Sequence, residues 1–327
     1  MKRIFIAILA VAALAACNKS EVVETAPAAA IAFDNVFVNN ATKAADLTKD
    51  NVADFGVYGF VQANNTEGQI FTNQRVYKQG SKFLYSPAQY WIGGAQYYFT
   101  AIAPYTGAAW KYNTTNAQNG TIEFNNETAG ANQDILFAYV EPDKTPETLT
   151  TSPDAVAFAF DHMLSRVRFT FTNQFGEGSN IELKVTDVVI TDAYKKGTIA
   201  VAEGVVAESW TPSEKTLNVT FGNAGTTKLA ENGGSAVTEH FYLIPANDSY
   251  NVAFKVELIQ AGVSVATYDR TATLTYDMKK GYSYDIKANL NPKNTSDDGE
   301  LYPIEFTVDS VDGWESYTNV DATLSTL

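Results

Sequence analysis

Few side chains in this 327-residue sequence have the chemistry of catalysis or metal binding: one cysteine and two histidines stand out. Cys17 follows an apolar stretch near the N-terminus, whereas His162 and His240 lie far apart along the chain. Zinc sites need several cysteine or histidine ligands, and a serine nucleophile needs a frame such as Gly-x-Ser-x-Gly, which the sequence lacks. We therefore predict no catalytic residue, no metal and no cofactor. We interpret both histidines as packed side chains that a hydrogen bond satisfies.

The first seventeen residues read as an export signal. Two basic residues precede an apolar stretch over residues 4–13 that is too short to span a bilayer. The residues Leu14-Ala15-Ala16-Cys17 resemble the lipobox of bacterial lipoproteins, in which the cysteine is acylated and becomes the new N-terminus. We predict a signal peptide over 1–16, cleavage between Ala16 and Cys17, and a lipid on Cys17 that tethers the protein to a membrane. The alternative is a free thiol at Cys17 in an exported chain.

The composition indicates an acidic, β-rich protein. The formal net charge is −14, so binding of nucleic acid through phosphate contacts is not expected. Hydrophobic residues make up 45% of the chain, enough for sizeable cores, and aromatic residues make up 13%, which favours β-structure. Because Cys17 is the only cysteine, no disulfide is available, and burial of apolar side chains must supply the stability.

From residue 31 onward, most periodic segments alternate apolar and polar residues, and Gly, Asn, Asp or Pro separate them. Almost no window shows the 3.6-residue period of a helix, so we predict an all-β chain. The predicted strands are 31–38, 55–61, 97–103, 121–124, 135–140, 155–160, 166–172, 181–190, 216–221, 239–244, 251–259, 263–268, 272–276, 282–290 and 302–311.

The length of the chain suits two domains of ordinary size. Residues 17–30 are polar and then alanine-rich, which is typical of a flexible tether. The proline-rich segment 141–154 suits either a linker or a long surface loop. We therefore predict an N-terminal β-sandwich domain over 31–150 and a C-terminal one over 151–327.

Several stretches in a fixed order carry a family resemblance. The most specific is Phe160-Asp161-His162-Met163-Leu164-Ser165-Arg166-Val167, and the next runs from Trp91 to Tyr105. Together with the lipobox, these stretches resemble the fimbrillin family of Bacteroidales lipoproteins, which includes the pilins of type V fimbriae and Mfa-like proteins. Further matching stretches are Asp54–Phe60, Asp134–Ala138, Tyr242–Pro245 and Gly281–Ile286.

The resemblance implies two transthyretin-like β-sandwich domains in tandem and a precursor that reaches the outer membrane as a lipoprotein. It also implies that in many members a trypsin-like protease, often arginine-specific, cuts behind the first strand. Loss of that strand leaves an apolar groove with unpaired backbone groups. A strand from the C-terminus of the next subunit is thought to fill the groove.

In this sequence the segment 31–38 is an apolar strand of the kind that such a groove would hold, and Lys43 and Lys49 follow it as candidate cleavage positions. The sequence departs from the family pattern because no arginine lies between Cys17 and Arg75. Either a lysine-tolerant protease cuts here, or the subunit keeps its first strand and its lipid. The second outcome would suit an anchor or accessory subunit.

The C-terminal segment 316–327 has Val320, Ala322 and Leu324 at alternate positions. Alternation of this kind suits a donor strand, because strand addition satisfies backbone groups and places side chains in successive pockets. The alternative is that this segment closes the sheet of its own second domain.

Our leading hypothesis is a structural or accessory subunit of a surface-exposed fimbria, lipid-anchored in the outer membrane through Cys17. Its partners would be other fimbrial subunits, joined by donor-strand exchange, and its surface could bind a host or bacterial ligand. The alternative is a surface glycan-binding lipoprotein of a polysaccharide-utilisation system, with tryptophans that stack on sugars. A hydrolase would need clustered carboxylates in a cleft, for which the sequence offers no frame. The four tryptophans are Trp91, Trp110, Trp210 and Trp314.

Overall fold

The computed structural model describes residues 29–38, 52–298, 304 and 306–310. Within these residues the regular structure is almost entirely β-strand, and the one helix is the four-residue α1 (Asn126–Ala129). The prediction of an all-β chain is therefore confirmed. Among the described residues, no helix is long and apolar enough to cross a membrane.

Seven strands from the first half of the chain form a closed sheet, in the order β1-β4-β3-β2-β5-β8-β9, with β9 paired back to β1. Side chains alternate between the inside and the outside, as the pleat of a strand requires. In β9, for example, Val156, Phe158, Phe160 and His162 are buried and the residues between them are exposed. The bounds are β1 (Phe33–Val38), β2 (Asp54–Ala63), β3 (Thr66–Gln79), β4 (Lys82–Leu84), β5 (Gln96–Ala103), β8 (Leu136–Val140) and β9 (Val156–His162).

Two open sheets pack face to face and form what we call the sandwich. One has the order β14-β10-β18-β19, with β15 also paired to β10, and the other has the order β17-β16-β11-β7-β6, with β12 and β13 also paired to β11. Aromatic rings meet between the sheets: Phe169 lies 4.9 Å from Phe221, and Phe171 lies 4.9 Å from Phe254, centroid to centroid. The bounds are β6 (Trp110–Thr114), β7 (Gly120–Asn125), β10 (Ser165–Asn173), β11 (Ile181–Ala202), β12 (Val205–Val206), β13 (Thr211–Gly222), β14 (Ser235–Val237), β15 (Phe241–Leu243), β16 (Asn247–Gln260), β17 (Val263–Asp277), β18 (Ser283–Leu290) and β19 (Phe306–Ser310).

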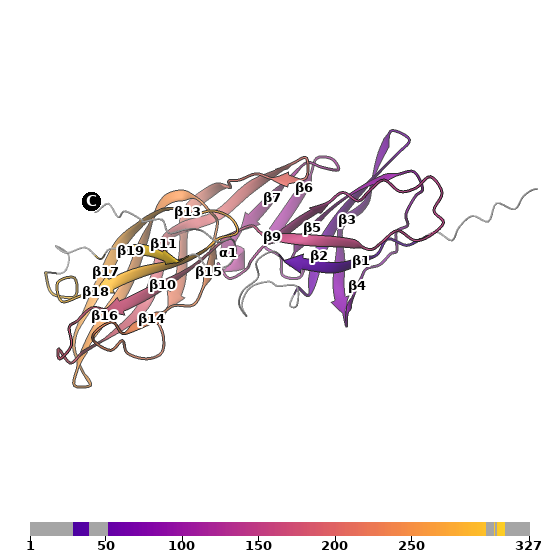
Figure 1. Ribbon diagram of the computed structural model, residues 1–327. Coiled ribbons are helices and arrows are strands. Elements are labelled where there is room, and N and C mark those ends of the chain that lie inside the picture. The colour runs from indigo at the N-terminus through magenta and orange to yellow at the C-terminus, as the bar shows by residue number, and fades with distance from the viewer. Residues whose placement is uncertain (1–28, 39–51, 299–303, 305, 311–327) are drawn as a thin grey trace, which may run out of the picture.

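The long strand β11 joins the two parts, which lie end to end in Figure 1. Its first portion, 181–190, pairs with β16, and its last portion, 196–201, pairs with β7. In the sequence, β7 lies between the closed-sheet strands β5 and β8. Gly197 lies where β11 crosses the junction, and a Cβ at this position would come within 3.0 Å of the side chains of Ile244 and Trp210. A side chain at this position would force the side chains of Ile244 and Trp210 to shift, so glycine suits the close packing at the junction.

Buried side chains form three clusters. The first fills the closed sheet and is rich in phenylalanine, and the second lies between the two sheets of the sandwich. The third lies between the two parts and draws on both, with Tyr58 and Ile102 from the closed sheet and Ile199 and Trp210 from the region of β11 and β13. The junction is therefore a packed core and not only a covalent connection.

The proline-rich segment 141–154 is a loop between β8 and β9, which pair with each other. Thr145 is buried and holds the loop against the closed sheet, because its N–H donates to the Ala95 carbonyl at 3.0 Å and its hydroxyl donates to the Ile92 carbonyl at 2.6 Å. β9 follows the predicted domain boundary at residue 150 and lies in the same closed sheet as the strands before it.

Candidate functional site

The first strand completes the closed sheet. β1 runs parallel to β9 on one side and meets β4 in antiparallel orientation on the other. The residues just before it are held in the same way: the Ile31 N–H donates to the Gln89 carbonyl at 2.8 Å, and the Val156 N–H donates to the Ala32 carbonyl at 2.8 Å. The segment 29–38 therefore satisfies backbone groups on two neighbours that would otherwise be sheet edges.

The side chain of Phe33 anchors this strand in the closed sheet. It is 3% exposed and is surrounded by four aromatic rings. Its ring centroid lies 5.6 Å from Phe71, 5.4 Å from Tyr85, 6.0 Å from Phe99 and 5.7 Å from Phe158. The sequence identified Phe33 as part of an apolar strand, but only the structure shows the aromatic cage around it.

This arrangement has a direct consequence for the closed sheet. Without the segment 29–38, β4 and β9 would become edges, and the aromatic rings beneath Phe33 would form the floor of an apolar groove. Such a groove accepts an extended apolar strand, because main-chain hydrogen bonds supply affinity and alternate side chains enter pockets.

The residues predicted to be modified or exchanged lie outside the described residues. They are Ala16 and Cys17 at the predicted cleavage and lipidation site, Lys43 and Lys49 at the predicted processing site, and Val320, Ala322 and Leu324 in the predicted donor strand. The processing site follows β1, whose last residue is Val38, and the predicted donor strand follows β19, whose last residue is Ser310.

The stretch Phe160–Val167, which carries the most specific resemblance, is where the chain crosses from the closed sheet to the sandwich. Nδ1 of His162 lies 2.7 Å from a carboxylate oxygen of Asp134, and both side chains are almost fully buried. The Ser165 hydroxyl donates to the Lys279 carbonyl at 2.8 Å, and the buried Arg166 donates from Nε to the Ser283 hydroxyl at 3.0 Å. The first contact holds the end of β9 on the closed-sheet side, and the other two hold the start of β10 within the sandwich. The stretch is therefore fixed on both sides of the crossing and has a structural role.

A buried carboxylate organises one end of the closed sheet, and sequence reasoning did not single it out. Asp54 is 4% exposed and accepts from Arg75 Nη2 at 2.8 Å and from the Tyr105 and Thr106 N–H groups at 3.1 Å each. The Thr106 hydroxyl donates to it as well. Burial by itself raises the pKa of Asp54, but the hydrogen bonds from Thr106, Arg75 and Tyr105 outweigh it and lower the pKa below its ordinary value.

Three of the four tryptophans are buried, with exposed fractions of 5% for Trp91, 9% for Trp110 and 5% for Trp210. Trp314 lies outside the described residues. Within the described part of the chain, the tryptophans therefore do not form an exposed stacking surface for sugars. No group of three or more potential metal-ligating side chains occurs in this part of the chain either.

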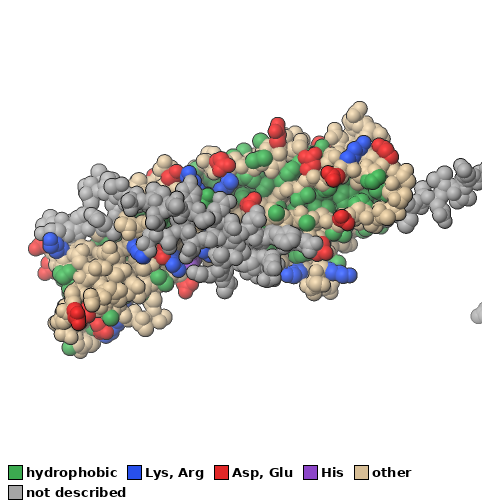
Figure 2. All heavy atoms as spheres, viewed as in Figure 1, with side chains coloured by type: hydrophobic (Ala, Val, Ile, Leu, Met, Phe, Trp, Pro, Cys, Tyr) green, Lys and Arg blue, Asp and Glu red, His purple; other side chains and the backbone are tan. Residues whose placement is uncertain are grey.

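Surface charge is mixed on the face that Figure 2 shows, where acidic and basic side chains are interspersed. Hydrophobic side chains are exposed over the closed-sheet end of this face. Among the described residues in this view, basic charge is not concentrated in the way that binding of a phosphate backbone requires.

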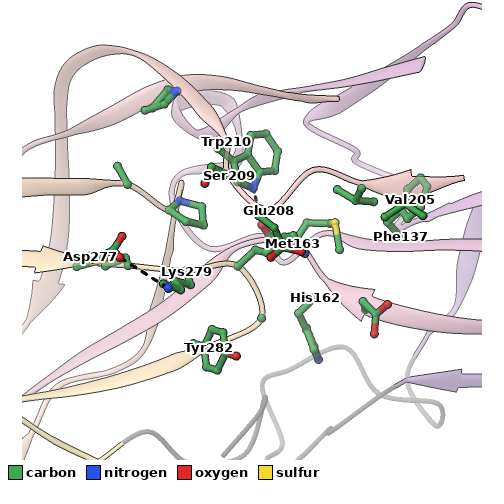
Figure 3. Close-up of a pocket in the computed structure, with 18 of the residues that line it drawn as sticks. Phe137, His162, Met163, Val205, Glu208, Ser209, Trp210, Asp277, Lys279 and Tyr282 are labelled. Atoms are coloured by element: carbon green, nitrogen blue, oxygen red, sulfur yellow. Dashed lines mark hydrogen bonds and ion pairs between the residues drawn. The ribbon is translucent and has the colours of Figure 1, made fainter. Parts of the chain in front are cut away.

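A pocket of about 930 Å³ lies at the junction of the closed sheet and the sandwich. Figure 3 shows Met163, Trp210 and Glu208 at its centre, with Val205 toward one end and Lys279 toward the other. The Trp210 indole N–H donates to the Met163 carbonyl at 2.7 Å, so this ring forms a fixed wall. We call this space the junction pocket.

Comparisons with known proteins agree with this architecture. The model of a family described as fimbrillin-like matches residues 42–308, which is most of the chain. The chain belongs to the fimbrillin-like family. A second model, for the lipid attachment site of prokaryotic membrane lipoproteins, matches residues 1–18 of this fimbrillin-like protein. No curated protein matches it.

One solved structure shares the fold of this fimbrillin-like protein at low sequence identity, and a second is similar at a lower score. A fimbrial protein from Bacteroides vulgatus is 14% identical, with a TM-score of 0.62, and the match covers 88% of this chain and all of that one. A candidate cell adhesion protein from Bacteroides ovatus is 15% identical, with a TM-score of 0.49, over 90% of this chain and 99% of that one.

Family membership and the attachment site together make this protein a fimbrial lipoprotein. The predicted resemblance is confirmed, and so is the prediction that the chain is not an enzyme, since the fimbrillin-like family consists of structural and adhesion proteins.

Proposed function

We propose that this protein is a subunit of a cell-surface fimbria and that it assembles with other fimbrial subunits by strand exchange. It would reach the outer membrane as a lipoprotein acylated on Cys17. The observation that supports this proposal best is the position of β1, which closes a sheet and fills an aromatic cage yet belongs to a short N-terminal segment. Its replacement by an equivalent strand would restore both the pairing and the packing.

Exchange needs a vacated groove, and the proposed route is proteolysis behind β1. Cleavage at Lys43 or Lys49 would separate β1 from the rest of the closed sheet, which begins again at β2. If neither lysine is cut in the cell, the subunit keeps β1 and its lipid and serves as an anchor or accessory subunit.

The proposed donor is the C-terminal segment 316–327, whose Val320, Ala322 and Leu324 would enter the pockets of a vacated groove. Alternate apolar side chains match the period of two that a strand needs when one face meets an apolar floor. We also propose that the closed sheet and the sandwich correspond to two domains of the family, with the boundary in the chain behind β9 and with the earlier β6–β7 hairpin reaching across to pair with β11.

The decisive experiment replaces Val320, Ala322 and Leu324 together by Asp in cells that produce the fimbria. We expect loss of polymers from purified surface fractions, because charged side chains cannot enter an apolar groove. A matched control replaces the alternate residues Asp321 and Thr323 by Ala and should leave polymers intact. Unchanged fibres in the Asp variant would contradict assembly through this segment.

Lipid anchoring has a separate test. Cys17→Ala should abolish incorporation of labelled fatty acid and release the protein from the membrane fraction. Retention of label in this variant would contradict acylation of Cys17.

A further inference from the structure

The last described strand, β19, points toward the junction pocket. β19 runs antiparallel to β18, and the last pair between them is Ser310 with Asp285. A chain that continues past Ser310 in the same direction runs alongside Tyr284 and Ser283 toward Tyr282, which lines the junction pocket. The last described strand therefore leads toward one end of this pocket.

Its length is sufficient to cross the pocket. An extended chain rises roughly 3.3 Å per residue, so the segment 311–327 reaches about 55 Å. A pocket of about 930 Å³ has room for several side chains of such a segment.

The chemistry of the segment matches the pocket from end to end. At the Tyr282 end the pocket has Lys280, together with Lys279, which is paired with Asp277 at 3.8 Å, and the first part of the segment has the acids Asp312 and Glu315. Attraction between Lys280 and one of these acids favours docking in one direction. Toward the other end the pocket has apolar walls, and the later part of the segment has the alternating apolar residues. These walls include Phe137, Met163, Val205 and Val206, and the alternating residues are Val320, Ala322 and Leu324.

A second segment also begins near this pocket but fits it less well. Residues 39–51 follow Val38, which pairs with Phe160, two residues before the pocket-lining His162. This segment is polar, and Leu47 is its only large apolar residue. It therefore offers little apolar surface to the pocket walls.

We propose that residues 311–327 dock in the junction pocket of their own chain before the subunit is assembled. The docked segment would cover the apolar walls of the pocket and keep the strand-forming residues from pairing with the wrong partner. The docking itself does not depend on strand exchange. The interpretation that docking stores the donor strand rests on the function proposed above.

The test measures access to the pocket in the mature chain, purified without lipid as a monomer that carries Cys17→Ser. A cysteine is introduced by Val205→Cys, at the pocket, or by Val263→Cys, at the tip of the β16–β17 hairpin. The two valines are exposed to similar extents, 68% and 64%, which makes them a matched pair. The rate of reaction with a maleimide is compared between the full chain and a chain that ends at Ser310.

We expect that removal of 311–327 raises the labelling rate several-fold in the Val205→Cys protein and leaves it unchanged in the Val263→Cys protein. Because deletion could disturb β19, the full-length pair Val320→Asp and Leu324→Asp serves as a second variant and should raise the rate in the same way. An equal rate with and without the segment would overturn the proposal.

A cross-linking arm identifies which chain supplies the segment. Val205→Cys combined with Leu324→Cys should form a disulfide within one molecule under mild oxidation, and Val263→Cys with Leu324→Cys should not. Covalent dimers in place of the internal disulfide would assign the pocket to a second copy and overturn docking within the chain. Because these measurements use monomers, they stay informative even if fibres form by another route.

Discussion

At the scale of single residues, Phe33 fixes the first strand. Its ring contacts four aromatic side chains within the closed sheet. We expect Phe33→Ala to lower the free energy of unfolding by about 3–5 kcal/mol, because it removes buried surface and leaves a cavity. The control Ala32→Ser changes an exposed neighbour and should shift it by no more than about 0.5 kcal/mol. Denaturant unfolding measures both, and equal effects would contradict the anchoring role.

A second residue-scale prediction concerns pH. The pKa of Asp54 is lowered in the folded chain from its ordinary value of 3.8. The ionised carboxylate therefore stabilises the fold fully above that value, and this contribution is lost as the pH falls through the folded pKa. At neutral pH we expect Asp54→Asn to lower the free energy of unfolding by about 1.5–3 kcal/mol, because it weakens hydrogen bonds to a charged group.

The pH dependence separates this role from simple packing. The gap in unfolding free energy between the parent chain and Asp54→Asn should shrink as the pH is lowered below 3.8. Asp143→Asn, which changes an exposed aspartate in the loop after β8, is the control and should show no such gap. A gap that stays constant with pH would show that the charge of Asp54 is not the cause.

At the scale of elements, the β6–β7 hairpin supports the junction by pairing with β11. Ile122 is fully buried in the third core, whereas its neighbour Thr121 is only partly buried. We expect Ile122→Ala to lower the free energy of unfolding by about 2–5 kcal/mol, and Thr121→Ala to change it by no more than about 0.5 kcal/mol. Because the third core draws on both parts, Ile122→Ala should destabilise them together. Calorimetry that showed only one part to be affected would contradict this role.

The elements also show what the sequence could predict. Alternation located most strands correctly, but the short strands β4, β6, β12 and β14 and the long strand β3 were missed. In β3 only Phe71 and Val76 of its fourteen residues are buried. These two lie five positions apart, and the positive φ of Asn73 between them marks a bulge that breaks the period of two. The segments 263–268 and 272–276 were predicted as two strands and form the single strand β17, since pairing with β16 continues across the polar residues between them.

Pairing over long distances lay beyond the sequence. Nothing in the residues of β7 indicates that they pair with 196–201 of β11, because backbone hydrogen bonds carry no side-chain signature. The same holds for the candidate site: the apolar character of 31–38 was readable, but its parallel pairing with β9 and the cage around Phe33 depend on packing between distant segments.

At the scale of the whole molecule, folding decides which basic residues a protease can reach. All four arginines behind Cys17 lie within strands: Arg75 in β3, Arg166 and Arg168 in β10, and Arg270 in β17. A protease must bind its substrate as an extended, unpaired chain, and paired strands do not offer one. The fold therefore protects every arginine of the mature chain, whereas Lys43 and Lys49 lie between the first two strands.

The positions of the arginines and of Lys43 and Lys49 predict opposite results for an arginine-specific and a lysine-specific protease. Brief digestion of the native mature chain by an arginine-specific protease should leave its mass unchanged. A lysine-specific protease should produce a new N-terminus at Ala44 or Asp50. In the double variant Lys43→Gln and Lys49→Gln the same enzyme should no longer produce either N-terminus, and cleavage ahead of β2 should be confined to Lys19, which leaves Ser20 as the N-terminus. Rapid cleavage at Arg75, or first cuts in the sandwich, would contradict processing behind β1 and favour a subunit that keeps its first strand.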